Sequence, residues 1–295
     1  MESAKTCGMP LVLAAVSATC LLANRARLIW RIETMTTLTI EDAFNNLSFY
    51  KSGHFPKQEV RCLLKHPEEV TPLLLQELDD VLSRHEQVPA EYMRHLYALY
   101  VLAHFRCEQL FPKIMALLQL PGEGASNLLG SGTITGYGLA NVIASTFNGD
   151  LSLLTAIIED PTVDHRVRVC ALSSITPLVF LGRLEPKTAL DYLTQLGQSE
   201  LEKKQWLLSA TLVEITMDLY LEKLKPIILE FFGKGLVDGY CSQDEFTNYF
   251  DAREDHRDWR DERMARNYHF VDAINDMQWW DCFQSKATLK KRATR

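Results

Sequence analysis

Apolar side chains recur at helical spacing along most of the chain. One such series consists of Tyr92, Leu96, Leu99 and Ala103, and a second consists of Trp206, Ala210, Val213, Met217 and Tyr220. Steps of three and four residues place side chains on one face of an α-helix. The period-two alternation typical of strands does not occur at useful length. The pattern therefore predicts an all-α protein.

Five apolar runs each open at a residue that favours a helix start: Pro72, Pro112, Asp150, Pro186 and Pro226. Proline is tolerated in the first turn of a helix, and aspartate is a common N-cap. The intervals between these positions are 40, 38, 36 and 40 residues, which lies near the period of HEAT-type helix pairs. We therefore predict an α-solenoid of HEAT-like helix pairs over residues 35–240, with an irregular helical bundle as the alternative.

Residues 134–196 show the repeated pattern most clearly. Four apolar helical segments follow one another there, separated by turns at residues 148–150, 160–161 and 182–183. The centre of the stretch, residues 164–172, has the pattern of a HEAT-like helix. We interpret the stretch as two adjoining repeats.

A glycine-rich connection precedes that stretch. Residues 121–138 contain six of the fourteen glycines. Such a loop before a helix can bind phosphate through its backbone N–H groups. This one lacks the lysine of a Walker motif and the strand that precedes a Rossmann motif. We favour a connection between repeats in which Thr133 or Thr135 caps the next helix, and we assign no cofactor-binding residues.

Charged residues dominate the region that follows the predicted repeats. Residues 244–266 carry eight acids and five arginines, interleaved, which is typical of a solvated, salt-bridged helix face. A metal site at Asp255, His256 and Asp258 is disfavoured because adjacent helical side chains point apart. We assign no metal ligands.

The end of the chain carries an apolar stripe of Phe270, Ile274, Met277 and Trp280. We interpret residues 241–285 as a C-terminal helical cap and residues 286–295 as a disordered basic tail. Trp279 and Trp280 point to different faces of a helix, so one packs on the last repeat while the other stays accessible. We favour simple end-capping, and Trp279 and Trp280 are candidate partner-binding residues as the alternative.

The first 34 residues form an N-terminal extension of different character. The uncharged run at residues 11–23 is short for a membrane span, and its flanks do not suit a cleaved signal peptide. Two interpretations stay open. Either Met35 is the native start, or the run is a short anchor that leaves the body in the cytoplasm. A membrane is an expected partner only in the second case.

Composition narrows the classes of function. A net charge of −7 argues against a general nucleic-acid binder. The seven cysteines are odd in number and scattered, which is typical of reduced thiols in a cytosolic protein. We therefore expect a cytoplasmic protein and no nucleic-acid partner.

Several motifs together resemble one family. They are LLG at residues 128–130, IT at 134–135, LANVIAS at 139–145, NGDLSLLTAIIEDP at 148–161, VRVCAL at 167–172 and WWDCF at 279–283. The combination resembles the bacterial DUF1186 family of uncharacterised helical-repeat proteins. The similarity extends from near Met35 to about Phe283. The resemblance implies a helical fold and brings no catalytic residues with it.

Two classes of function remain. The first is a non-enzymatic scaffold or adaptor that binds a protein on the concave surface of the solenoid. An exported bacterial effector that acts on host partners is a variant of it. The second is an enzyme of unrecognised class whose site uses carboxylates and histidines such as His95, His104 and His165. The sequence favours the first, assigns no catalytic residue and leaves the oligomeric state open.

Overall fold

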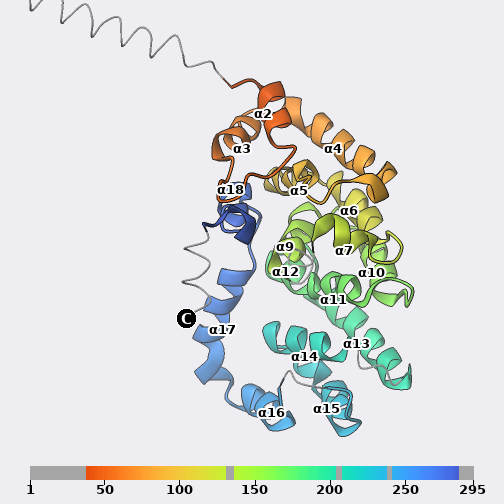
Figure 1. The fold of residues 1–295 in the computed structure, drawn as a ribbon. Helices are drawn as coiled ribbons and strands as arrows, with labels where there is room; N and C mark the ends of the chain where they lie inside the picture. Colours follow the sequence, from red (N-terminus) through yellow and green to blue (C-terminus); the bar gives the residue numbers. More distant parts are fainter. Residues whose placement is uncertain (1–37, 131–135, 204–207, 238–240, 286–295) are drawn as a thin grey trace, which may run out of the picture. The chain divides into compact units, whose positions relative to one another are not determined.

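The structure is a computed structural model that describes residues 38–130, 136–203, 208–237 and 241–285 (Figure 1). The chain divides into two compact units, Met1–Thr39 and Ile40–Arg295, and the second contains every helix discussed below. The described residues contain no strand, only isolated bridges from Phe49 to Tyr92 and from Lys51 to His54. The all-α prediction is confirmed.

The helices have the following bounds. The first are α2 (Ile40–Asn46), α3 (Lys57–Leu64), α4 (Pro67–Ser83), η1 (His85–Gln87), α5 (Arg94–His104), α6 (Leu110–Leu118) and α7 (Gly124–Leu129). The next are α9 (Tyr137–Thr146), α10 (Leu151–Glu159), α11 (His165–Ser173), α12 (Ile175–Phe180) and α13 (Pro186–Lys203). The last are α14 (Ser209–Asp218), η2 (Glu222–Leu224), α15 (Lys225–Gly233), α16 (Gln243–Asp251), α17 (Arg253–Asn267), α18 (Ala273–Met277) and η3 (Asp281–Phe283).

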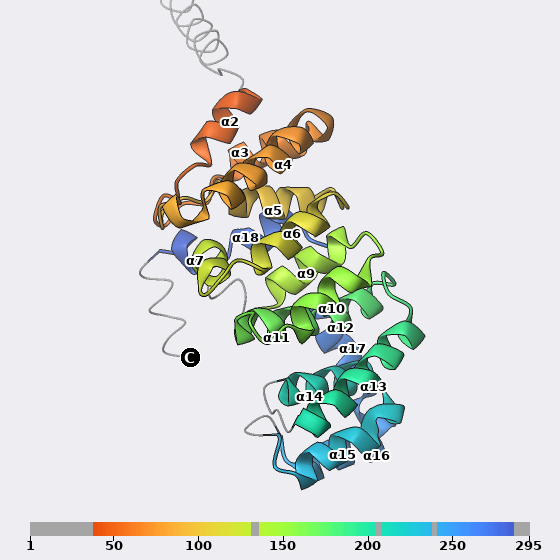
Figure 2. The same ribbon diagram turned by 90° about the vertical axis from the view of Figure 1, so that its right-hand side faces the viewer.

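Consecutive helices pack on one another in chain order (Figure 2). Helix α2 packs on α3, α4 on α5, α10 on α11 and α14 on α15, while α5 also packs on α9 and α6 on α10. This is an all-α fold of the helical-repeat type. The narrower HEAT-like description stays a prediction.

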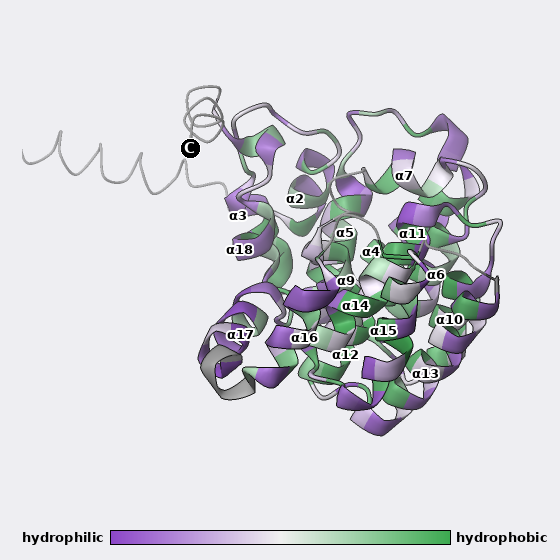
Figure 3. Cartoon of the chain, turned by 90° about the horizontal axis from the view of Figure 1, so that it is seen from below, coloured by the Kyte–Doolittle hydropathy of each residue, from purple (hydrophilic) through white to green (hydrophobic). Residues whose placement is uncertain are grey.

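Hydrophobic side chains at the centre of this array hold it together. Every residue from His95 to Ala103 in α5 is buried, because α5 contacts α3, α4, α6, α9 and α18. A helix that is apolar on all sides needs such cover. The outermost charged helix, α17, is coloured mostly hydrophilic in Figure 3, as its sequence predicted.

Local capping explains several helix starts. The Asp150 side chain accepts a hydrogen bond from Ser152 N at 3.1 Å and begins α10. Asp164 accepts one from Arg166 N at 2.7 Å and begins α11. Each bond satisfies an N–H group that has no partner inside its helix. The predicted starts at Asp150 and Pro186 are confirmed, and Pro226 lies in the first turn of α15.

Two predictions about helix boundaries are wrong. Pro72 lies inside α4, which begins at Pro67. The carbonyl that Pro72 leaves without its helical donor belongs to Glu68, an exposed residue, so water can satisfy it. The third segment of residues 134–196 is two helices, because α11 ends at Ser173 and α12 begins at Ile175.

The glycine-rich connection is also more ordered than predicted. Helix α7 occupies residues 124–129, and Gly136 stands at the N-cap position of α9. The predicted capping residues Thr133 and Thr135 lie outside the described residues, as Trp206 does.

The C-terminal segment takes a course that the sequence did not reveal. Helix α16 packs on α14, and Phe246 contacts Phe232 of α15 with ring centroids 5.7 Å apart. After α17 the chain returns to the first helices, where α18 packs on α5 and α3 (Figure 1). Gly53 N donates to Cys282 O at 3.1 Å. The predicted packing of a tryptophan on the last repeat is therefore wrong.

The predicted domain limits at 34, 240 and 285 stay predictions. Residues 1–34, with the apolar run at 11–23, and residues 286–295 lie outside the described part of the chain. Within that part, no helix combines the length and the apolar character needed to cross a membrane.

Candidate binding site

The chain is extended over residues 268–271, and this segment, together with Asn267 at the end of α17, lies against α9 and is called the strap below (residues 267–271). Asn141 Nδ2 donates to Asn267 O at 2.9 Å, and Asn141 Oδ1 accepts from His269 N at 3.4 Å. Ser145 Oγ accepts from Val271 N at 3.0 Å. Asn141 and Ser145 lie one turn apart on α9 and so share a face. In a helix or sheet, the N–H and C=O groups of the strap would pair with other backbone groups. Here the side chains of Asn141 and Ser145 take the place of those partners.

A buried ion pair anchors the start of the strap. The carboxylate of Asp218, at the end of α14, is fully buried and pairs with Arg263 of α17. Tyr268 donates its hydroxyl proton to Asp218 Oδ2 at 3.1 Å. The Tyr268 ring meets Tyr137 edge to face, with centroids 5.4 Å apart. The strap is thus fixed to both α14 and α9.

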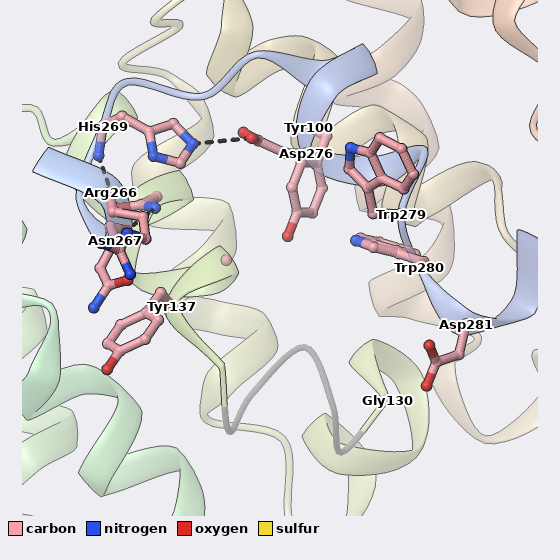
Figure 4. A pocket seen from close by; sticks show the side chains of 12 residues that line it. Tyr100, Gly130, Tyr137, Arg266, Asn267, His269, Asp276, Trp279, Trp280 and Asp281 are labelled. Carbon is pink, nitrogen blue, oxygen red and sulfur yellow. Dashed lines mark hydrogen bonds and ion pairs between the residues drawn. The ribbon is translucent and has the colours of Figure 1, made fainter. Parts of the chain in front are cut away.

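A cavity of about 570 Å³ lies beside the strap, and we call it the tryptophan pocket (Figure 4). This volume lies in the usual range for ligand sites. The residues that line it come from α5, α9, α17, α18 and the segments next to them. They are Tyr100, Gly130, Tyr137, Gly138, Asn141, Arg266, Asn267, His269, Asp276, Trp279, Trp280 and Asp281.

The two tryptophans differ in their surroundings. The ring of Trp280 packs edge to face on Tyr100 at 5.2 Å and stacks on Phe283 at 6.2 Å. Trp279 is 60% exposed. One ring is thus packed and the other accessible. Both residues lie in the turn after α18, so the prediction that they occupy different faces of a helix is wrong. Their role in binding a partner stays a prediction.

Gly138 allows α9 to approach α5 closely. A Cβ atom at this position would collide with the Tyr100 hydroxyl. Tyr100 cannot easily move away, because it is buried and packs on Trp280. The glycine therefore helps to set the inner wall of the pocket.

Charged groups occupy one end of the tryptophan pocket. His269 Nε2 lies 2.9 Å from Asp276 Oδ1, and Asp276 Oδ2 accepts from Asp272 N at 3.0 Å. The hydrogen bond that His269 donates to the Asp276 carboxylate raises the pKa of His269, against the opposing effect of burial. Arg266 is exposed, and no carboxylate of the described residues pairs with it. This end of the pocket therefore offers a guanidinium and an imidazole.

Replacing Asp276 by asparagine is expected to lower the pKa of His269, because a neutral amide stabilises the imidazolium less than a carboxylate does. Because folding raises the pKa of His269, the protonated imidazole contributes its full stabilisation at pH values below the pKa of the unfolded state. This contribution is lost as the pH rises through the pKa of the folded state. Titration of the His269 ring resonances by NMR measures the shift. Asp191→Asn, which removes an exposed acid that pairs with Lys187, is the control. An unchanged His269 titration in Asp276→Asn would contradict the assignment.

The three histidines named from the sequence do not meet in one groove. His95 is buried, with Nε2 2.7 Å from Leu128 O, and burial lowers its pKa. His104 is exposed, and its ring contacts Phe105. His165 is exposed and lines a different cavity. Sequence reasoning missed His269, because its partner Asp276 lies seven residues away in α18, and residues 268–272 between the two helices are not helical.

The charged stretch also contains no metal cluster in its described portion. The side chains of Asp255 and His256 lie outside the described residues, and Asp258 is exposed. No group of three or more His, Cys, Asp or Glu side chains among the described residues has the geometry to hold a metal ion.

Comparison with known proteins gives three results. The sequence profile of a family described as "Protein of unknown function (DUF1186)" matches residues 38–284. An uncharacterised protein of Chlamydia trachomatis serovar D is 27% identical over 230 residues, which cover 77% of this chain and 88% of that protein. An uncharacterised protein of Chlamydia muridarum is 29% identical over 191 residues, which cover 64% of this chain and 76% of the other. No solved structure matches.

Proposed function

Because the chain belongs to the DUF1186 family, whose description names no activity, we propose a function from the geometry of the site. The protein is a non-enzymatic binding module, and its tryptophan pocket receives a short acidic segment of a partner protein. The cytoplasm is its expected location, and export to act on a host protein is a variant of the same proposal.

The observation that carries the proposal is the exposure of Trp279. Its side chain is 60% exposed at the edge of a cavity of about 570 Å³. A tryptophan that leaves water on binding removes a large apolar area, which is why this residue type is frequent among the residues that dominate binding energy. Trp280 and Tyr100 behind it are packed, so the wall is already formed.

Charge argues for an acidic segment. The chain as a whole is acidic, with a net charge of −7, yet Arg266 and His269 together occupy one end of the pocket (Figure 4). A carboxylate of the partner can accept two parallel hydrogen bonds from a guanidinium such as Arg266. Asp281 lies at the opposite end (Figure 4) and suits a donor such as a backbone N–H. An acidic side chain next to an apolar one fits this arrangement.

The proposal is tested by panning a displayed random-peptide library on the full chain. We expect enriched peptides to combine an acidic with an aromatic or aliphatic residue. Trp279→Ala and, separately, Arg266→Ala are expected to weaken their binding about tenfold or more. Trp259→Ala is the matched control, because Trp259 is also 57% exposed but does not line the pocket. Peptides that lack acids, or that bind Trp279→Ala unchanged, would refute the proposal.

A second candidate is an enzyme that uses His269 as a general base. The observation in its favour is the 2.9 Å contact with Asp276, because a carboxylate can orient and charge-stabilise a catalytic imidazole. Mass spectrometry of the enriched peptides after incubation with the full chain separates the two candidates. If the wild-type chain modifies the peptides and His269→Gln does not, the protein is an enzyme that uses His269. Recovery of intact peptides supports the binding module.

A further inference from the structure

A second cavity, separate from the tryptophan pocket, lies between α9, α11 and α14. Its volume is about 360 Å³, and Tyr268 of the strap closes one side. Apolar groups such as Val169 and Ile215 form part of the wall, and Glu214 of α14 contributes a carboxylate. We call this the Glu214 pocket. Tyr137 lines both cavities.

We propose that the Glu214 pocket binds an organic cation that carries an ammonium or guanidinium group on an aliphatic stem. This inference does not rest on the function proposed for the tryptophan pocket. It follows from the balance of charge in the wall and from the kind of surface around the carboxylate.

Among the described residues, the charge balance leaves Glu214 without a cation of its own. Glu214 and Asp218 lie one turn apart on α14, and Arg263 is the described cation that interacts with both. Arg263 forms its ion pair with Asp218. Two carboxylates thus share one guanidinium, and the excess negative charge belongs to Glu214. A ligand cation in the pocket would neutralise it.

The cations at the edge of the pocket already have acidic partners. Arg166 Nη2 lies 2.9 Å from Asp164 Oδ2 and 3.7 Å from Glu123 Oε1. His165 Nδ1 lies 3.8 Å from Asp164 Oδ1. These groups therefore add no net positive charge to the pocket.

The surroundings of Glu214 suit the stem of such a ligand. Burial raises the pKa of Glu214, and Arg263 opposes this shift. A carboxylate that has lost part of its water gains more from an incoming cation than an exposed one does. The rings of Tyr137 and Tyr268 lie in the wall, and aromatic faces attract cations. The ligand can come as a free amine or as a lysine or arginine side chain of another protein.

Ligand-observed NMR titration of the full chain tests the proposal with three probes. These are n-butylammonium, its uncharged analogue n-butanol, and Nα-acetyl-lysine amide. We expect at least one of the two cations to bind and n-butanol to bind about tenfold or more weakly. Binding of both cations indicates that any aliphatic ammonium fits, and binding of the lysine derivative alone indicates a protein side chain as the source. If n-butanol binds as tightly as the cations, or if neither cation binds, the proposal is wrong.

Variants locate the site. Glu214→Gln keeps the shape of the side chain and removes its charge, and we expect it to weaken cation binding about tenfold or more. Glu230→Gln makes the same change of charge at an exposed carboxylate that pairs with Lys234, and should leave binding unchanged. Equal cation affinity in Glu214→Gln and wild type would overturn the proposal. Trp279→Ala should bind the cations normally, so a failure of this proposal is distinguishable from a failure at the tryptophan pocket.

Discussion

Replacing Arg263 by alanine is expected to lower the free energy of unfolding by about 3–5 kcal/mol, because it leaves a buried charge without its partner. Arg263 pairs with Asp218, whose carboxylate is fully buried. Among the described residues, the Tyr268 hydroxyl, 3.1 Å from Asp218 Oδ2, would then be the one remaining partner of this carboxylate. A neutral hydrogen bond offsets only a small part of the cost of a buried carboxylate. Urea denaturation of the full chain, followed by circular dichroism, measures the change.

Arg260→Ala is the matched control for this result. Arg260 lies about one turn earlier on the same helix, and its partner Asp261, at 2.8 Å, is mostly exposed. The Arg260 side chain is 19% exposed and lies over the Tyr220 ring, but its removal leaves no buried carboxylate behind. An ion pair to an exposed carboxylate contributes about 0–1 kcal/mol. The double variant Arg263→Ala, Asp218→Asn should recover part of the loss, because the buried charge is gone. If Arg263→Ala lowers the free energy of unfolding no more than Arg260→Ala does, water must reach the Asp218 carboxylate, and the prediction is wrong.

Features that depend on neighbouring residues could be predicted from the sequence. Asp150, the predicted cap, begins its helix through a bond that spans two residues, so its signal lies within one turn of the chain. Asp164 caps α11 in the same way, although the sequence pattern placed it inside the helix. The helical class follows from apolar spacing. Pro72 misled the prediction because proline marks a helix start only on average, and α4 already has Pro67 at that position.

The site could not be predicted, because it depends on contacts between distant parts of the chain. The Ser145 hydroxyl and the Val271 N–H that it accepts are 126 residues apart. Nothing in the pattern around Asn141 distinguishes an asparagine that binds a backbone segment from one that faces solvent. The arginines of α17 were predicted to lie on a solvated face, and Arg263 instead pairs with a fully buried carboxylate. The periodicity of a helix predicts which of its side chains share a face. It does not predict which distant residue will contact that face.

Removing the two side chains that hold the strap is expected to release it. In the double variant Asn141→Ala, Ser145→Ala, the strap loses three hydrogen bonds from α9: one to Asn267 O and two from the N–H groups of His269 and Val271. We expect the free energy of unfolding to fall by about 2–4 kcal/mol. Each hydrogen bond contributes about 1 kcal/mol, and a buried N–H group left without a partner costs more. Hydrogen exchange measures the result, and the amides of residues 267–271 should exchange faster than those of α10 and α11.

The pattern of exchange decides whether the strap forms the tryptophan pocket or only lies beside it. The strap carries His269, and the chain reaches Trp280 through it, so its release should also turn the Trp280 ring out of its contact with Tyr100 and shift its fluorescence to the red. Ser174→Ala is the control, because the Ser174 hydroxyl is buried but donates to Cys170 O, in the last turn of the neighbouring helix α11, at 2.8 Å. Faster exchange throughout the chain would mean that α9 itself has lost stability. Faster exchange confined to residues 267–283 would mean that the strap forms the tryptophan pocket. Two side chains of α9 would then hold the pocket together by binding a backbone segment near the end of the chain.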